Sequence, residues 1–228
     1  MSSLPAGDRS DDTHQLGHLF IVTYGRSGST LLQGVLNSIP GYLIRGENDG
    51  AVYHLHQFHS ACVGKKRRLR KRFEVPLDAT NPHFGLDDFP AKVSVRMLRR
   101  LVTSTVLRPG PDTRVTGFKE IRWYQEDLPA YVDFLRLLFP AARFLVNTRD
   151  HEAVLQSGWW PDKPKDGRLE RMESAILDVA ASLGDRAYRV HFDDYTADPA
   201  VLHGLFDWLG EDFDETRVRA VLGVRHSV

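Results

Sequence analysis

The sequence contains little cysteine and no long apolar segment. Cys62 is its only cysteine, which excludes an internal disulfide and a cysteine cluster for a metal, and suits a reducing compartment. No apolar run reaches the roughly 18 residues of a membrane span. Residues 1–17 are polar and lack the apolar core of a signal peptide. We therefore expect a soluble, cytoplasmic protein without membrane insertion, in which residues 1–17 form a flexible tail.

An excess of either charge is also absent. The 30 basic and 30 acidic side chains balance, so no overall field attracts nucleic acid or an anionic membrane, and any attraction to anions must be local. The densest local charge is at residues 65–72, where seven of eight residues are cationic. Such a run is usually a solvated face or a mobile loop, although it could recruit a polyanionic acceptor or nucleic acid.

The apolar segments that are present predict one α/β domain over residues 18–228. Five short runs rich in β-branched and aromatic residues indicate strands, at 19–23, 42–44, 115–118, 143–148 and 188–192. Segments with helical character separate them, including 50–61, 91–107, 128–139, the stretch after Arg149 through 158, and 168–183. This alternation predicts a central, mostly parallel sheet of about five strands with helices on both faces.

The first strand leads into a loop of small residues and then into a helix. Backbone N–H groups of such a loop converge at the positive end of the helix dipole, so the segment predicts a phosphate or sulfate site. Arg26 adds a planar guanidinium that can bind two oxygens of one anion. The candidate anion-binding residues are Tyr24, Gly25, Arg26, Ser27, Gly28, Ser29 and Thr30.

Two common nucleotide-binding loops fit this segment less well. A nucleoside triphosphatase loop would place lysine before its Ser or Thr, and no lysine precedes Ser29 or Thr30. A dinucleotide-binding loop needs a third glycine, which is missing here, but Glu47 follows at a suitable distance and keeps that alternative open. An ordinary tight turn with a surface arginine is the simplest alternative.

Charged residues also follow the second and third predicted strands, and ligands of open α/β sheets bind at the carboxyl ends of strands. Glu47 follows the second strand, where it either caps the next helix or acts as a base. Lys119 ends the third strand and could neutralise a transferring anion. The simpler alternative is that Lys119 or Arg122 pairs with Glu120.

The fourth strand ends at Arg149, and Ser157 lies eight residues further on, in an expected helix. This interval is a little over two helical turns, so the two side chains can face one ligand group. An arginine and a hydroxyl together suit a phosphate monoester.

Histidines at positions 54, 56 and 59 lie along another predicted helix. Only His56 and His59 have the spacing that two metal ligands on one helix face require, and no cysteine is near them. We therefore expect no metal site.

Taken together, these segments resemble the sulfotransferases that use 3′-phosphoadenosine 5′-phosphosulfate (PAPS). Residues 24–32, Tyr-Gly-Arg-Ser-Gly-Ser-Thr-Leu-Leu, are similar to the family's 5′-phosphosulfate loop, and Arg149-Asp150 with Ser157 is similar to its 3′-phosphate motif. The segment from Phe192-Asp193-Asp194-Tyr195 through Asp198-Pro199 to Leu209-Gly210 resembles the family's closing strand, turn and helix. Arg26 in the loop is typical of bacterial and carbohydrate-type members. An Arg-Lys-Gly segment, which supplies a third 3′-phosphate contact in other members, is not recognisable near the end of the chain.

The resemblance implies a transferase that moves a sulfuryl group from PAPS to a hydroxyl of a carbohydrate or glycosylated metabolite, with 3′-phosphoadenosine 5′-phosphate (PAP) as product and no required metal. The loop, Arg26 and Lys119 would stabilise the leaving charge, and Glu47 would be the general base, because carbohydrate-type relatives carry a glutamate after the second strand. His54, His56, His83 and Glu120 remain alternative bases. A homodimer is left open.

Two other functions are compatible with the sequence. One is a P-loop nucleotide kinase or hydrolase. The other is a non-enzymatic module that binds polyanions through residues 65–72.

Overall fold

The computed structural model describes residues 16–164 and 166–223, so the predicted tail over 1–17 lies almost entirely outside the described residues. The fold is built on a five-stranded sheet in the order β2-β3-β1-β4-β5, and every neighbouring pair is parallel. The strands are β1 Gly17–Val22, β2 Tyr42–Arg45, β3 Val115–Glu120, β4 Arg143–Thr148 and β5 Ala187–His191. The predicted α/β fold with a parallel sheet is confirmed.

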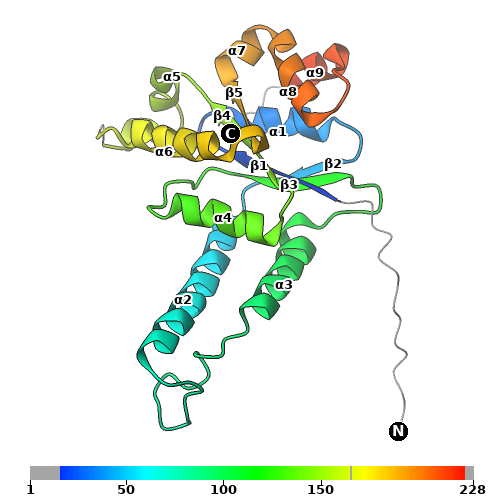
Figure 1. Cartoon of the computed structure of the whole chain (residues 1–228). Coiled ribbons are helices and arrows are strands. Elements are labelled where there is room, and N and C mark those ends of the chain that lie inside the picture. The colour runs from blue at the N-terminus through cyan, green and yellow to red at the C-terminus, as the bar shows by residue number, and fades with distance from the viewer. Residues whose placement is uncertain (1–15, 165, 224–228) are drawn as a thin grey trace.

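Alternate residues of the central strand β1 divide the core into two layers. Phe20 and Val22 belong to a buried cluster on one face, whereas Leu19 and Ile21 belong to the cluster on the other face. This division follows from the two-residue period of a strand, and both faces of a parallel sheet are normally covered. The sheet therefore sits between two helical layers, as Figure 1 shows.

The helices that cover the sheet are short to medium in length. The first layer contains α4 Leu128–Leu138 and α6 Arg168–Leu183, and the second contains α1 Ser29–Asn37, α8 His203–Leu209 and α9 Glu215–Leu222. Shorter helices, α5 His151–Leu155 and α7 Phe192–Ala197, directly follow β4 and β5. Asp198 caps the 3₁₀ turn Pro199–Leu202, because its carboxylate accepts a hydrogen bond from the Ala200 N–H.

Two further helices, α2 Ala51–Arg72 and α3 Ala91–Val102, form an arm that extends away from the sheet (Figure 1). The sequence predicted helix only over 50–61, but α2 continues through the whole basic run. Lys65, Lys66 and Arg70 stabilise this extension because they reach the returning loop, at His83 Nε2 (2.9 Å), Phe89 O (2.7 Å) and Asp87 O (2.8 Å). The helix predicted over 91–107 is α3 followed by a π-helical turn, Thr103–Leu107.

The helix predicted to run through residue 158 is shorter than expected. α5 ends at Leu155, and the following 3₁₀ turn, Trp160–Asp162, packs back onto the first loop. Among the described residues, no helix combines the length and the apolar character needed to cross a bilayer.

Candidate active site

A cavity of about 320 Å³ lies at the carboxyl ends of β1, β2, β3 and β4, and we call it the glycine-loop cavity. It is located where the strand order predicts a ligand, because the chain leaves β1 toward α1 at this edge of the sheet. Eight of the sequence-predicted site residues line it: Gly25, Arg26, Gly28, Ser29, Thr30, Glu47, Lys119 and Arg149. Leu31, Ile121, Trp159 and Phe192 complete the lining.

The start of α1 presents an anion-binding geometry to this cavity. Gly28 occupies the N-cap position with φ of 76°, no side chain caps the helix, and its first turn contains no acidic residue. The first N–H groups of a helix have no partner within the helix, and their dipoles favour a negative charge. A Cβ at Gly28 would lie 2.0 Å from a ring carbon of Phe192, so both the backbone angle and this contact require glycine.

Two of the predicted loop residues, Tyr24 and Ser27, do not line the cavity. Their side chains stabilise the loop through contacts with the strands and helices beneath it. Ser27 is fully buried, and its hydroxyl lies 2.7 Å from that of Thr23, which in turn contacts the Asn147 carbonyl oxygen at 2.7 Å. Tyr24 donates to Glu173 (2.6 Å) and accepts from the Arg149 N–H (2.9 Å). Burial, together with the Glu173 hydrogen bond, raises the pKa of the Tyr24 phenol far above its usual value, so it remains a hydrogen-bond donor.

Arg26 and Arg149 line the cavity and are connected to each other, and Ser157 contacts Arg26 without lining the cavity. Arg149 Nη1 donates to the Arg26 carbonyl oxygen (2.9 Å), and Arg26 Nε donates to Ser157 Oγ (3.0 Å). The Arg149 guanidinium lies over the Phe192 ring, 4.5 Å from its centroid. Arg149 Nε is buried and has no hydrogen-bond partner among the described residues, although Asp193 Oδ1 is 4.0 Å away. A buried, charged N–H of this kind is costly unless a ligand oxygen accepts from it.

Glu47 and Lys119, which both line the cavity, form an ion pair. Lys119 Nζ is 2.5 Å from Glu47 Oε1, and the lysine side chain is only 7% exposed whereas the glutamate side chain is 35% exposed. The other Glu47 oxygen, Oε2, lies 3.9 Å from Arg122 Nη1. Lys119 therefore does not pair with Glu120, the simpler alternative considered from sequence. The Glu47 carboxylate stays partly accessible from the cavity that it lines.

Glu120, an alternative base, has a structural role. It is 1% exposed, and its Oε2 accepts from the N–H groups of Asn48 (3.2 Å) and Gly50 (3.1 Å). Its Oε1 accepts from the N–H groups of Ile121 (2.8 Å) and Arg122 (3.3 Å). With both oxygens occupied, Glu120 fixes the loop that carries Glu47 and the start of α2.

The alternative histidine bases lie on α2, at His54 and His56, and in the loop between α2 and α3, at His83. His54 contacts Gln57 (2.9 Å) on α2, and His83 contacts Lys65. His56 is buried and bonds to Asp127 Oδ2 (2.9 Å), and its neighbour His59 bonds to Ser94 Oγ (3.0 Å). None of these four side chains lines the glycine-loop cavity.

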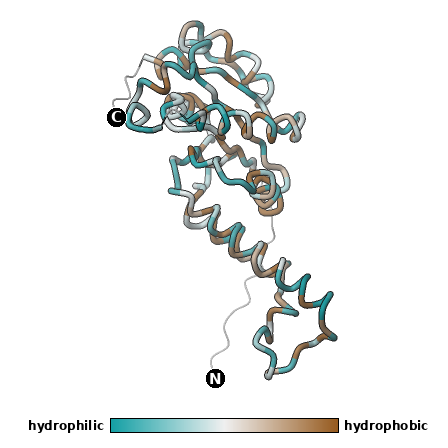
Figure 2. The backbone as a smooth tube through the Cα atoms, turned by 90° about the vertical axis from the view of Figure 1, so that its left-hand side faces the viewer, coloured by the Kyte–Doolittle hydropathy of each residue, from teal (hydrophilic) through white to brown (hydrophobic). Residues whose placement is uncertain are grey.

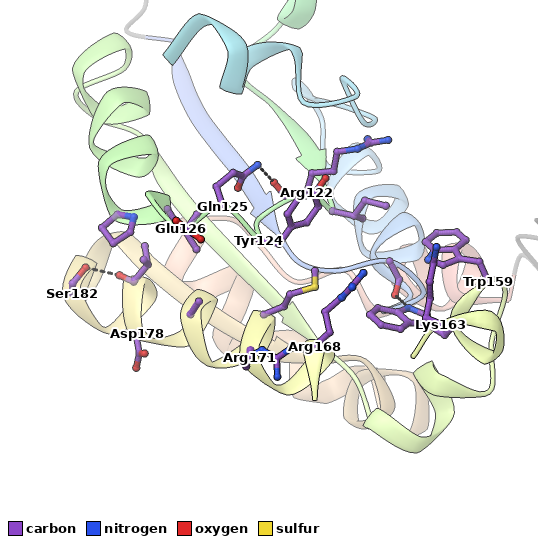
Figure 3. A pocket seen from close by; sticks show the side chains of 18 residues that line it. Arg122, Tyr124, Gln125, Glu126, Trp159, Lys163, Arg168, Arg171, Asp178 and Ser182 are labelled. Atoms are coloured by element: carbon purple, nitrogen blue, oxygen red, sulfur yellow. Dashed lines mark hydrogen bonds between the residues drawn. The ribbon is translucent and has the colours of Figure 1, made fainter. Parts of the chain in front are cut away.

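A second and larger cavity, of about 1090 Å³, adjoins the first and shares Gly25, Ile121 and Trp159 with it. Its walls come from the segment after β3 and from α6, as Figure 3 shows. Exposed aromatic rings, Tyr124 (60% exposed) and Trp159 (45%), line this space. Arg168 on α6 points into it (Figure 3).

Sequence reasoning gave no role to Ile121, Trp159 and Phe192, all of which line the glycine-loop cavity. Two features of the sequence could have pointed to Trp159 and Phe192. Trp159 closely follows Ser157, and Phe192 opens a segment that resembles the family. The neighbouring Trp160 fixes this arrangement because its indole N–H donates to the Gly25 carbonyl oxygen (2.9 Å).

A five-stranded parallel sheet with a glycine loop between β1 and α1, and basic side chains at the adjoining strand ends, defines a P-loop-like α/β domain. The family model described as "Sulfotransferase family" matches residues 18–215, and the chain belongs to that family. No curated protein matches the chain.

Three solved structures are similar to this chain at low sequence identity. The sulfotransferase domain from the curacin biosynthetic pathway is 16% identical, with a TM-score of 0.54 over 89% of this chain and 76% of that chain. Sulfotransferase STF9 from Mycobacterium avium is 15% identical, with a TM-score of 0.46 over 95% of this chain and 70% of its own. A sulfotransferase from Alicyclobacillus acidocaldarius is 14% identical, with a TM-score of 0.45 over 86% and 81%.

Proposed function

We propose that residues 18–228 form a PAPS-dependent sulfotransferase that sulfates a hydroxyl of a carbohydrate or glycosylated metabolite. The observation that carries this proposal is the buried Arg149 Nε without a hydrogen-bond partner among the described residues, in the same cavity as the uncapped start of α1. Two separate donor groups in one cavity suit a ligand with two anionic ends.

The residues present fit the donor. The N–H groups at the start of α1 and the Arg26 guanidinium would hold its phosphosulfate end, with Gly25, Ser27, Gly28, Ser29 and Thr30 forming the loop and Tyr24 supporting it. Arg149 and Ser157 would hold the 3′-phosphate, since Arg149 Nε needs an acceptor. PAPS supplies an activated sulfuryl group, and PAP is left as product.

Catalysis in this proposal rests mainly on charge stabilisation. Arg26 and Lys119 would hold the negative charge that develops on the leaving phosphate. Glu47 would take the acceptor hydroxyl's proton as the acceptor oxygen bonds to sulfur, and its ion pair with Lys119 keeps base and charge stabiliser together. No step of this proposal requires a metal.

The larger cavity is our candidate acceptor site. It opens from the glycine-loop cavity at Ile121, two residues beyond Lys119. The exposed rings of Tyr124 and Trp159 support a sugar acceptor, because an aromatic ring offers an apolar face beside polar groups. We further propose a cytoplasmic location, because a single cysteine suits a reducing compartment.

A thermal-shift assay with PAP tests the donor assignment. In EDTA, millimolar PAP should raise the melting temperature, because a ligand at about 100 times its Kd adds roughly 2.7 kcal/mol to folding stability. Arg149→Ala should remove most of this shift. Arg136→Ala, which changes an arginine of α4 that is paired with Asp133 and does not line the cavity, is the matched control and should keep it.

Two results would contradict the donor assignment. One is no stabilisation by PAP at millimolar concentration, and the other is an undiminished shift in Arg149→Ala. Stabilisation by ATP that depends on magnesium would instead favour the nucleotide kinase or hydrolase. The acceptor is then identified by a screen with labelled sulfate donor, carbohydrates first and phenols second.

A further inference from the structure

The arm formed by α2 and α3 carries charge of one sign only. α2 contains seven Lys or Arg residues and α3 contains four, and neither helix contains Asp or Glu. The whole chain is balanced, with 30 residues of each sign, so the compensating acidic residues lie outside these two helices. Four of them, Glu74, Asp78, Asp87 and Asp88, lie in the loop that joins the helices. The arm projects away from the sheet in both views (Figures 1 and 2), which presents this charge as a separate surface.

An apolar stripe runs along one side of the same arm. Phe58 on α2 is 52% exposed, and Val93, Met97 and Leu101 on α3 are 41%, 49% and 44% exposed. Val93, Met97 and Leu101 are spaced by four residues, so they follow one side of α3. Exposed apolar side chains gathered in this way usually mark an interaction surface.

Phe58 belongs to the same side as the α3 stripe. His59 Nδ1 lies 3.0 Å from Ser94 Oγ, so positions 59 and 94 face each other between the two helices. In an antiparallel pair, the residue before each facing position projects to the same side of the pair, here Phe58 and Val93. We call Phe58, Val93, Met97 and Leu101, with the flanking Arg96 and Arg100, the arm face.

The two arginines of the arm face, Arg96 and Arg100, are available to bind a partner. Lys65, Lys66 and Arg70 bind the returning loop, but Arg96 and Arg100 are exposed and form no salt bridge within the part of the chain that the structure describes. Further along α2, Arg67, Arg68, Lys71 and Arg72 are also exposed.

We propose that the arm face docks on an anionic lipid membrane. A bilayer surface offers an anionic headgroup layer above an apolar acyl layer. On the arm face, the arginines would contact the headgroups while the apolar side chains between them reach the acyl layer. A second copy of this chain fits poorly, because an isologous contact would bring two acid-free, cationic helices together. The docking is peripheral and independent of the sulfotransferase proposal.

Vesicle co-sedimentation of the full chain tests this. At low salt the protein should pellet with vesicles of phosphatidylcholine mixed with phosphatidylglycerol, but not with phosphatidylcholine alone, and added salt should release it. Arg96→Gln with Arg100→Gln should weaken binding by roughly fivefold for each arginine, since each is worth about 1 kcal/mol near an anionic surface. Met97→Asp with Leu101→Asp should weaken it at least as much, with an unchanged melting temperature.

Matched controls come from exposed positions away from the arm. Val201→Asp changes a side chain that is 49% exposed, and Arg219→Gln removes a cation from α9. Both should bind vesicles as the unchanged protein does.

Four outcomes would overturn the proposal. They are no binding to anionic vesicles at low salt, equal binding to neutral vesicles, binding to the soluble polyanion heparin but not to vesicles, and a dimer in solution that Met97→Asp with Leu101→Asp dissociates. The third would assign the arm to soluble polyanions, and the fourth would assign it to a second copy.

Discussion

Replacing Glu47 by glutamine separates its proposed role as a base from its role in the ion pair. In the structure, Glu47 Oε1 accepts from Lys119 Nζ at 2.5 Å, and Lys119 is almost fully buried. Glutamine keeps an oxygen that can accept from this lysine but loses the charge and the ability to take a proton. Because the Glu47 side chain is 35% exposed, we expect a modest loss of folding stability, about 1–2 kcal/mol.

The expected effect on turnover is much larger. Loss of a general base costs ~10²–10⁴ in rate, and even a hundredfold loss corresponds to about 2.7 kcal/mol of transition-state stabilisation. Affinity for PAP should remain nearly intact, because glutamine still accepts a hydrogen bond from Lys119 and the residues proposed to hold PAP are unchanged. The variant should therefore lower kcat at least a hundredfold while the PAP-induced thermal shift persists.

Steady-state transfer from labelled PAPS, combined with the PAP thermal shift, measures both quantities. Asp49→Asn is the matched control, since Asp49 lies in the same loop, pairs with Arg122 and is 88% exposed, and its turnover should stay within a fewfold of the unchanged protein. If Glu47→Gln kept comparable turnover, Glu47 would not be the base. If the variant also lost the PAP shift, its ion pair with Lys119 would be part of the donor site instead.

Three other changes probe the framework of the site. Glu120→Gln puts an amide NH₂ against backbone N–H donors and should cost about 2–4 kcal/mol in denaturant-induced unfolding, with turnover per folded molecule largely retained. Gly28→Ala, which forces a Cβ into the ring of Phe192 at a φ of 76°, should abolish the PAP thermal shift, whereas Gly46→Ala, with nothing within 4 Å, should keep it. Burial lowers the pKa of His18 from 6.5 to about 4. Between these two pH values the folded state therefore binds fewer protons than the unfolded state. Stability should therefore fall as pH drops from 6.5 toward 4, and less steeply in His18→Gln; equal slopes would contradict this.

The sheet and the location of the site were predictable because they depend on local patterns. Short apolar runs separated by helical segments specify a parallel sheet, and its strand ends then bring distant residues to one edge. Arg26, Glu47, Lys119 and Arg149 line one cavity for this reason. Their roles in binding and catalysis stay predictions.

The extension of α2 through residues 62–72 was not predictable, because it depends on contacts with a loop further along the chain. Residues 65–72 contain no apolar period beyond Leu69, and a cationic run repels itself in isolation. Three of its side chains bind carbonyl or ring acceptors of the returning loop, between His83 and Phe89, and this tertiary contact holds the helix. A local pattern carries no information about such a contact.

Side-chain pairing at the strand ends was only partly foreseen. The sequence suggested Lys119 or Arg122 against Glu120; Arg122 Nη1 does approach Glu120 Oε1 at 3.5 Å, but Lys119 pairs with Glu47. The reason is that neighbouring side chains of β3 project to opposite faces of the sheet. Glu120 points inward, where backbone N–H groups satisfy it, whereas Lys119 is adjacent on the strand and therefore projects to the opposite side.

The residues predicted to bind the donor divide into two groups with different physical tasks. Tyr24 and Ser27 use their side chains to contact Glu173 and Thr23 beneath the loop, so an anion meets a loop whose shape is already fixed. Arg149 retains a buried N–H with no partner among the described residues. A fixed loop lowers the ordering cost of binding, and an unsatisfied buried donor makes the empty site costly. Because these two features favour an anion in the same place, they support the glycine-loop cavity as the site of the proposed chemistry.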